Sequence, residues 1–73
     1  MSDDSVPAIQ TVQRAAVILN AFTIRRPQLS LSEITEALGS TKATAHRYAK
    51  ALREVGLLRY DSASATYTLG PAA

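Results

Sequence analysis

Apolar residues recur at helical spacing along the first third of the chain. They lie three or four residues apart and form one stripe, made of Val12, Ala16, Leu19 and Phe22. Thr11 is a suitable N-cap for this segment, and Arg25-Arg26-Pro27 closes it because the residue before a proline avoids the helical region. The pattern predicts a first helix between these signals. Residues 1–8 hold two acids, two serines and Pro7 without periodicity, and we expect them to be a disordered tail.

A second, shorter helix is predicted after the first. Leu29-Ser30-Leu31 alternates and predicts a minimal strand, and the segment that follows reads as a helix of two turns. Ser32 is favoured as the N-cap, whereas Ser30 with Glu33 offers a capping box two residues before it. Gly39 supplies the left-handed residue that ends the helix. Its inward positions are expected to be Ile34, Ala37 and Leu38.

A third helix follows after a tight turn. Ser40 or Thr41 caps it, it runs to about residue 55, and Gly56 ends it. Its expected packed positions are spaced by three and four residues: Ala45, Tyr48, Ala49, Leu52 and Val55. Small residues at such positions, together with Ala37, allow two helices to approach closely.

The last segment alternates in the manner of strands. Residues 57–60 and 66–69 are rich in Leu, Tyr and Thr and are separated by a small polar loop, which predicts a β-hairpin. The order of elements predicts a mainly α fold with a small β-hairpin, a winged helix-turn-helix of three helices plus a wing. The domain is expected to cover residues 9–71, with the helix-turn-helix at 31–50 and the wing at 57–69.

The composition of the chain excludes two of the usual ways in which a small domain is stabilised. The chain has 73 residues, no cysteine and one histidine, which excludes disulfides and Cys/His zinc sites. A domain of this size has a marginal core, so association with a second copy is the remaining means. Ile9, Ala15 and Ile18 widen the apolar surface of the first helix. They indicate either a well-buried helix or a dimerisation surface, and a homodimer through the first helix is expected.

The distribution of charge indicates a polyanionic partner. The formal net charge is +2, yet residues 40–60 carry five basic residues against one acidic residue, a local balance of +4. The start of the chain, with Asp3 and Asp4, is unlike a signal peptide. The longest apolar run, Ala15 to Leu19, is too short to span a membrane. We therefore expect a cytoplasmic protein without a membrane partner.

The predicted architecture places the basic residues where DNA would lie. In a helix-turn-helix the second helix enters the major groove by its N-terminal end, which gives the third helix, over residues 41–55, the role of recognition helix. Arg47 is the preferred base reader because its guanidinium matches the edge of guanine. The hairpin would contact the backbone through Arg59, and the loop before the second helix through two arginines. The candidate contacts with double-stranded DNA are Thr41, Lys42, Thr44, His46, Arg47, Lys50, Arg59, Arg25 and Arg26.

Two other classes of function, a protein-docking module and an enzyme, are alternatives to DNA binding. The basic residues could form an ordinary solvated helix face, or a winged-helix module could use that face to dock an acidic protein. An enzyme is not expected, because the chain has no phosphate-cradling glycine loop, no nucleophile elbow and no convergent titratable groups. The sequence therefore predicts no catalytic residue, no cofactor and no metal site.

The ordered motifs resemble the isocitrate lyase regulator (IclR) family of bacterial transcription regulators. The resemblance rests on residues 11–22, 29–34, 41–47, 54–58 and 67–70 and covers about residues 9–71. It implies operator binding as dimers or dimers of dimers, a first helix that joins the DNA-binding domains, and contacts by Lys42, Thr44 and Arg47. It also implies a C-terminal domain, absent from this chain, that binds small-molecule effectors. The chain departs from the family pattern at Thr41, Ala43 and Tyr48, and Ala43 removes a hydroxyl that could touch phosphate.

Overall fold

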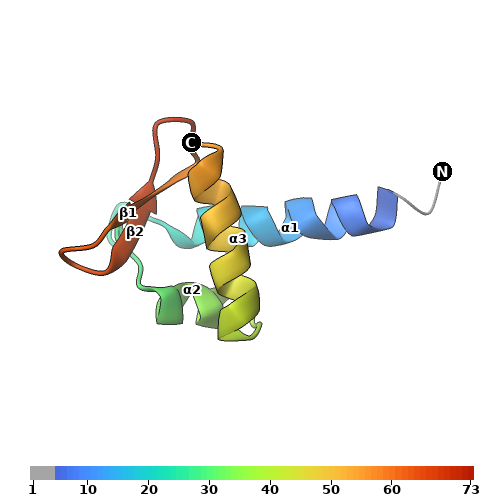
Figure 1. Cartoon of the computed structure of the whole chain (residues 1–73), viewed down its shortest axis with the longest axis horizontal. Helices are drawn as coiled ribbons and strands as arrows, with labels where there is room; N and C mark the ends of the chain where they lie inside the picture. Colours follow the sequence, from blue (N-terminus) through green and yellow to red (C-terminus); the bar gives the residue numbers. More distant parts are fainter. Residues whose placement is uncertain (1–4) are drawn as a thin grey trace.

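The computed structural model describes residues 5–73 as three helices followed by a hairpin (Figure 1). The elements are α1 (Ser5–Ala21), α2 (Leu31–Leu38), α3 (Lys42–Glu54), β1 (Leu58–Asp61) and β2 (Thr66–Leu69). Helices α2 and α3 pack on each other and on α1, and the hairpin lies against α3. The order of elements confirms the predicted mainly α fold, a winged helix-turn-helix.

Helix α1 begins six residues before the predicted N-cap at Thr11. The prediction of a disordered tail over residues 1–8 is wrong for residues 5–8, which lie in the helix, while residues 1–4 lie outside the described part of the chain. Pro7 is the third residue of α1, and a proline is tolerated in the first turn because the amides there have no partner within the helix. The helix ends at Ala21, before the predicted stop. Thr23 and Arg26 close a turn there through two backbone hydrogen bonds of 3.1 Å.

The buried face of α1 is rotated from the predicted stripe. Ile18 is fully buried and Phe22 nearly so, whereas Val12 is 66% exposed. The prediction that Ile18 lies at a dimer interface is therefore wrong, since this side chain is at the centre of the chain's own core. Ala15 is half-buried and packs against that core, and Ile9 is 48% exposed. Apolar residues spaced by three and four can be grouped into more than one stripe on the same helix. Only the packing of the other elements decides which stripe is buried.

Side-chain caps define the helix-turn-helix. Ser30, not Ser32, is the N-cap of α2: its hydroxyl accepts a hydrogen bond from the Glu33 N–H, and the Glu33 carboxylate accepts one from the Ser30 N–H. Gly39 has φ +66° and ends α2 in the left-handed conformation, as predicted. Thr41 caps α3, so the turn between the two helices is three residues long.

The core lies where α1, α2, α3 and the hairpin meet. From α3 it receives Ala45, Ala49 and Leu52, in agreement with the predicted packed face, whereas Val55 is exposed. Ala37 of α2 is also exposed, so its predicted inward position is wrong. Ala37 lies on the side of α2 that carries Glu33 and Glu36, and Val55 is the C-cap residue after the last turn of α3. The core side chains are Ile18, Phe22, Leu29, Ile34, Ala45, Ala49, Leu52, Leu58 and Tyr67.

The wing is an antiparallel hairpin with Leu58 opposite Leu69 and Asp61 opposite Thr66. The predicted strand at 29–31 is reduced to one bridge, in which Leu29 and Tyr67 exchange backbone hydrogen bonds of 3.0 and 2.7 Å. It cannot extend further because Ser30 is already the cap of α2. At the base of the hairpin the backbone of Gly70 lies against Gly56, and a Cβ at Gly70 would stand 2.4 Å from the Gly56 carbonyl oxygen.

Helix α1 gives the molecule its elongated shape. The principal extents are 43 × 25 × 21 Å, and the N-terminal part of α1 projects beyond the other elements (Figure 1). Within residues 5–73 no helix combines the length and the apolar character that crossing a membrane requires.

Candidate nucleic-acid interface

The first turn of α3 is built by two threonines. The Thr41 hydroxyl oxygen accepts a hydrogen bond from the Thr44 N–H at 3.2 Å and donates its proton to the Thr44 hydroxyl at 3.1 Å. The hydroxyl of Thr41 is therefore engaged in capping. Thr44 accepts that bond, which leaves its own proton for donation elsewhere. Lys42 and Ala43 lie between them and are exposed.

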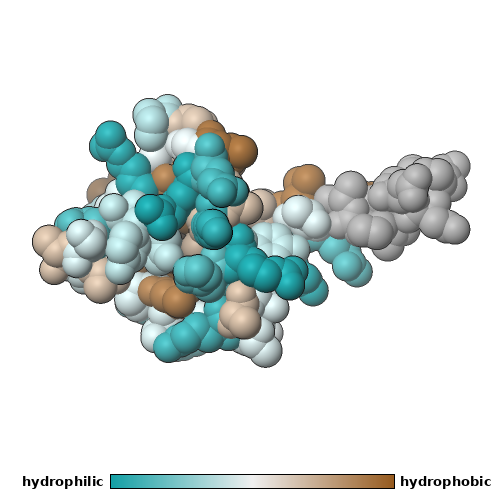
Figure 2. Space-filling view, in the orientation of Figure 1, coloured by the Kyte–Doolittle hydropathy of each residue, from teal (hydrophilic) through white to brown (hydrophobic). Residues whose placement is uncertain are grey.

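A basic surface runs along the side of α3 that faces away from the core. Ala45, Ala49 and Leu52 point inward, so the intervening positions face solvent. We call the exposed residues Lys42, His46, Arg47 and Lys50 the basic face. Figure 2 shows hydrophilic side chains gathered over α3 on the side toward the viewer. The structure thus brings together the α3 cations that the sequence singled out, on one face of one helix.

The basic face continues into a groove between α3 and the hairpin. The groove has a volume of about 810 Å³ and holds three cations and two carboxylates. It is lined by Lys50, Arg53 and Glu54 of α3, by Leu58, Arg59, Tyr60 and Asp61 of β1, and by Gln28 and Thr68. The guanidinium carbon of Arg53 lies 5.2 Å from the centre of the Tyr60 ring, a cation–π contact. Arg59 of the wing and Lys50 of α3 therefore line the same groove. Arg53 was missed as a site residue, although its spacing of three from Lys50 places both on one side of the helix.

The tip of the wing is held by local hydrogen bonds and carries no cation. The Asp61 carboxylate accepts bonds from the Ala63 N–H at 3.0 Å and from the Ser64 hydroxyl at 2.9 Å. Residues 62–65 are small and exposed. The positive charge of the hairpin is therefore at its base, next to α3.

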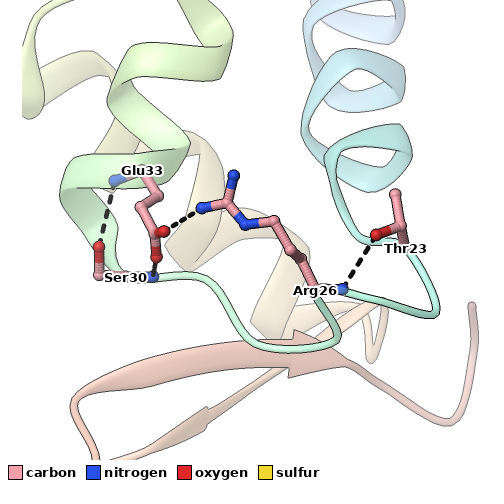
Figure 3. Close-up of polar contacts among 4 residues, drawn as sticks. All are labelled: Thr23, Arg26, Ser30 and Glu33. Atoms are coloured by element: carbon pink, nitrogen blue, oxygen red, sulfur yellow. Dashed lines mark hydrogen bonds and ion pairs between the residues drawn. The ribbon is translucent and has the colours of Figure 1, made fainter.

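The two arginines of the loop before α2 lie in a different setting. Arg26 forms an ion pair with the Glu33 carboxylate, and Figure 3 shows the guanidinium turned toward it. Arg26, Glu33 and Glu36 line one shallow hollow with Ala37, so two carboxylates surround this cation. The Ser30 N–H and hydroxyl, with the Arg26 charge, hold the pKa of Glu33 below its ordinary value of 4.5. Arg25 is exposed, and neither arginine lines the groove beside the basic face.

Comparison with known proteins places this arrangement in a family. A profile of the IclR helix-turn-helix domain matches residues 11–62. The chain is 39% identical over 62 residues to the glycerol operon regulatory protein of Streptomyces coelicolor, which covers 85% of this chain and 24% of that protein. It is 39% identical over 61 residues to the HTH-type transcriptional regulator KipR of Bacillus subtilis, covering 84% and 24%. This chain therefore spans about a quarter of the length of the curated relatives it matches.

A solved structure agrees with these relatives. The crystal structure of an IclR family transcriptional regulator from Brucella abortus superposes with a TM-score of 0.79 at 31% identity, over 85% of this chain and 24% of that one. The relatives named here are regulators, not enzymes. The family profile covers most of the chain, the superposition reproduces its fold, and the resemblance noted in the sequence is confirmed: the chain belongs to the IclR helix-turn-helix family.

Proposed function

We propose that this chain binds double-stranded operator DNA sequence-specifically, as the DNA-binding part of a transcriptional regulator. The observation that carries the proposal is the basic face. Its cations are exposed on α3, the second helix of a helix-turn-helix, and α3 begins with a turn capped by Thr41. The N-terminal end of a helix favours a bound phosphate. A basic stretch without this placement would support only a general affinity for anions.

The roles of the residues follow from their positions on α3 and the wing. Arg47 lies one turn into the helix and is the proposed reader of a base edge, with His46 beside it. Lys42, Thr44, Lys50 and Arg59 are proposed phosphate or base contacts along the same surface. Thr41 serves first as the cap of α3. If Lys42, Arg47, Lys50 and Arg59 each neutralise one phosphate, the slope of log K against log salt is roughly −3 to −4 per subunit.

Of the two arginines in the loop before α2, only Arg25 is proposed as a DNA contact. Arg25 is exposed and remains a proposed phosphate contact. Arg26 would have to leave the Glu33 carboxylate in order to bind a phosphate, and separating that pair would offset the gain. We therefore assign Arg26 to the turn before α2.

The projecting part of α1 supports a homodimer. Ile9 is 48% and Val12 66% exposed, and they lie three residues apart on one side of the helix. A helical segment of about ten residues is marginal in water unless its apolar side is covered. A second copy of α1 would cover it, and Ala15 borders the same stretch. Pairing through α1 leaves the basic face of α3 open, so one dimer would present two recognition helices to two half-sites.

The other expectations from the sequence follow from this role. Operator binding places the protein in the cytoplasm, and any response to a small-molecule effector would require a domain outside this chain. The rival function, in which the basic face docks an acidic protein, has no feature in its favour beyond the charge itself. It is an outcome of the test below.

The test is selection from a randomised duplex pool at two salt concentrations, followed by Arg47→Ala. We expect an enriched motif with two-fold symmetry, and a loss on the order of 1–3 kcal/mol for Arg47→Ala that is larger on the selected motif than on random DNA. Lys50→Ala is the matched control: it should weaken both duplexes alike and lower the slope by about one. An equal loss on both duplexes for Arg47→Ala would make Arg47 a phosphate anchor. Weak binding with no enrichment would favour the acidic protein partner.

A further inference from the structure

The junction between α1 and α3 holds a second group of cationic and hydroxyl side chains. Arg14 of α1 donates a long hydrogen bond of 3.5 Å from its Nη1 to the Tyr48 hydroxyl on α3, and its guanidinium carbon lies 5.9 Å from the centre of the Tyr48 ring. Thr11, one turn before Arg14, also contacts the Tyr48 hydroxyl. Thr11, Arg47, Tyr48 and Ala51 line a small hollow at this junction.

Arg14 holds a distinct position in the charge pattern. It is the one charged residue of α1, which runs over 17 residues from Ser5 to Ala21. Its place on the helix puts that charge beside α3, at the edge of the basic face, where the two helices cross (Figure 1). A helix that needed charge only for solubility would gain as much from any exposed position.

The charged groups that act on Tyr48 at the junction are the arginines Arg14 and Arg47. Hydrogen bonds from Arg14 and Thr11, and the charges of Arg14 and Arg47, hold the pKa of Tyr48 below its ordinary value of 10.0. Within residues 5–73, neither the lining of the hollow nor the groups acting on Tyr48 include a carboxylate. Arg26 makes the contrast, because Glu33 already supplies its counterion.

We infer that Arg14, with the hydroxyls of Tyr48 and Thr11, forms a binding site for a backbone phosphate of DNA at the α1–α3 junction, and that the nearby charge of Arg47 strengthens it. A guanidinium has five N–H donors, and the Tyr48 hydroxyl occupies one of those of Arg14. Arg14 and Arg47 are both exposed, so a phosphate can reach them from solvent. A phosphate bound to Arg14 at this junction would also be attracted by the charge of Arg47, which lines the hollow beside Tyr48.

Tyr48 is a positioning residue in this site as well as a donor. Its ring and hydroxyl hold Arg14 against α3, so less side-chain freedom is lost when a phosphate binds. The inference rests on the proposed DNA binding and extends the contact surface from α3 and the wing onto α1.

The test measures how the affinity for a random-sequence duplex depends on salt. The variants are made in the whole 73-residue chain, and circular dichroism confirms that each is folded. Arg14→Gln keeps a polar side chain with an N–H donor, shortens it and removes the charge. We expect the slope of log K against log salt to become less steep by about 0.9 per bound subunit, which is about a 3.5-fold smaller defect at 200 than at 50 mM salt. Arg14→Lys should restore the slope.

Two controls separate a phosphate contact from a structural role. Tyr48→Phe removes the hydroxyl that holds Arg14 and should therefore weaken binding. Because it removes no charge, it should leave the slope unchanged. Arg26→Gln removes a charge that Glu33 already neutralises and should leave the slope at the wild-type value. If Arg14→Gln keeps the wild-type slope while Arg47→Gln lowers it, the junction site does not exist and the main proposal stands. If the wild-type chain binds no duplex at low salt, DNA binding itself fails.

Discussion

Replacement of Ile18 by alanine separates the core of one subunit from the contact between two. Ile18 is 0% exposed, so the change removes three carbons from a fully enclosed site. A truncation of this kind lowers the free energy of unfolding by about 2–5 kcal/mol. A chain of 73 residues has a total stability of about 4–11 kcal/mol, at roughly 0.05–0.15 kcal/mol per residue. We therefore expect Ile18→Ala to remove at least about a fifth of the stability, and about half of it at the middle of both ranges.

The assay is urea unfolding followed by circular dichroism at several protein concentrations. For a small domain with a slope near 1 kcal/mol per molar urea, the midpoint should fall by about 2 M or more. The fall should persist at the lowest concentration, where a dimer has dissociated, because Ile18 stabilises the single chain. Concentration dependence of the midpoint reports the contribution of the dimer.

Val12 provides the matched substitution on the same helix. It is 66% exposed, so Val12→Ala should change the stability of the single chain by no more than about 0.5 kcal/mol. Val12→Asp should place a charge in the proposed dimer contact and weaken association, as measured by sedimentation. The reasoning would be refuted if Ile18→Ala weakened association and left the dilute chain as stable as before, because Ile18 would then be a subunit contact.

Two further changes test the backbone and the capping box. Because hydrogen bonding and Arg26 lower the pKa of Glu33 in the folded state, its contribution to stability is complete above pH 4.5 and is lost as the pH falls through the folded-state pKa. Glu33→Gln should therefore be less stable than wild type at pH 7, with a smaller difference at pH 3, in urea unfolding at both values. Gly70→Ala should destabilise by about 1–3 kcal/mol in thermal unfolding, since its Cβ would meet the Gly56 carbonyl at 2.4 Å. Gly39→Ala meets no atom within 4 Å and should show only the left-handed strain of about 1–2 kcal/mol. A Gly70→Ala variant as stable as wild type would contradict the close approach at Gly70.

The local signals that predicted this fold correctly are those with a short-range cause. Gly39 ends α2 because a left-handed residue is needed there, and Ser30 with Glu33 forms a capping box because three residues separate them. The sequence offers both Ser32 and Ser30 as the cap and favours Ser32, whereas the structure has Ser30. The two reciprocal hydrogen bonds of Ser30 and Glu33 satisfy two backbone N–H groups. A serine cap without a partner three residues later satisfies only one. The hairpin was correct to within a residue at each strand.

The features that the sequence did not predict depend on packing. Whether Val12 or Ile18 faces the core is decided by where α2 and α3 sit on α1, and helical spacing alone allows both. The sequence places the start of α1 too late, because residues 1–8 contain two acids, two serines and Pro7 and show no helical periodicity. Pro7 is compatible with a helix because it lies in the first turn of α1, where the backbone amides have no partner within the helix.

The partners of the arginines decide which of them remain available to DNA, and a count of charges cannot show this. Glu33 cancels the charge of Arg26. Arg53 rests on Tyr60 and Arg14 on Tyr48, and an aromatic ring orients a guanidinium without neutralising it. An arginine held by tyrosine therefore reaches a phosphate with its full charge and with part of its conformational entropy already lost. This ordering predicts the salt response: charge removal at Arg14 or Arg53 should lower the slope, and charge removal at Arg26 should not.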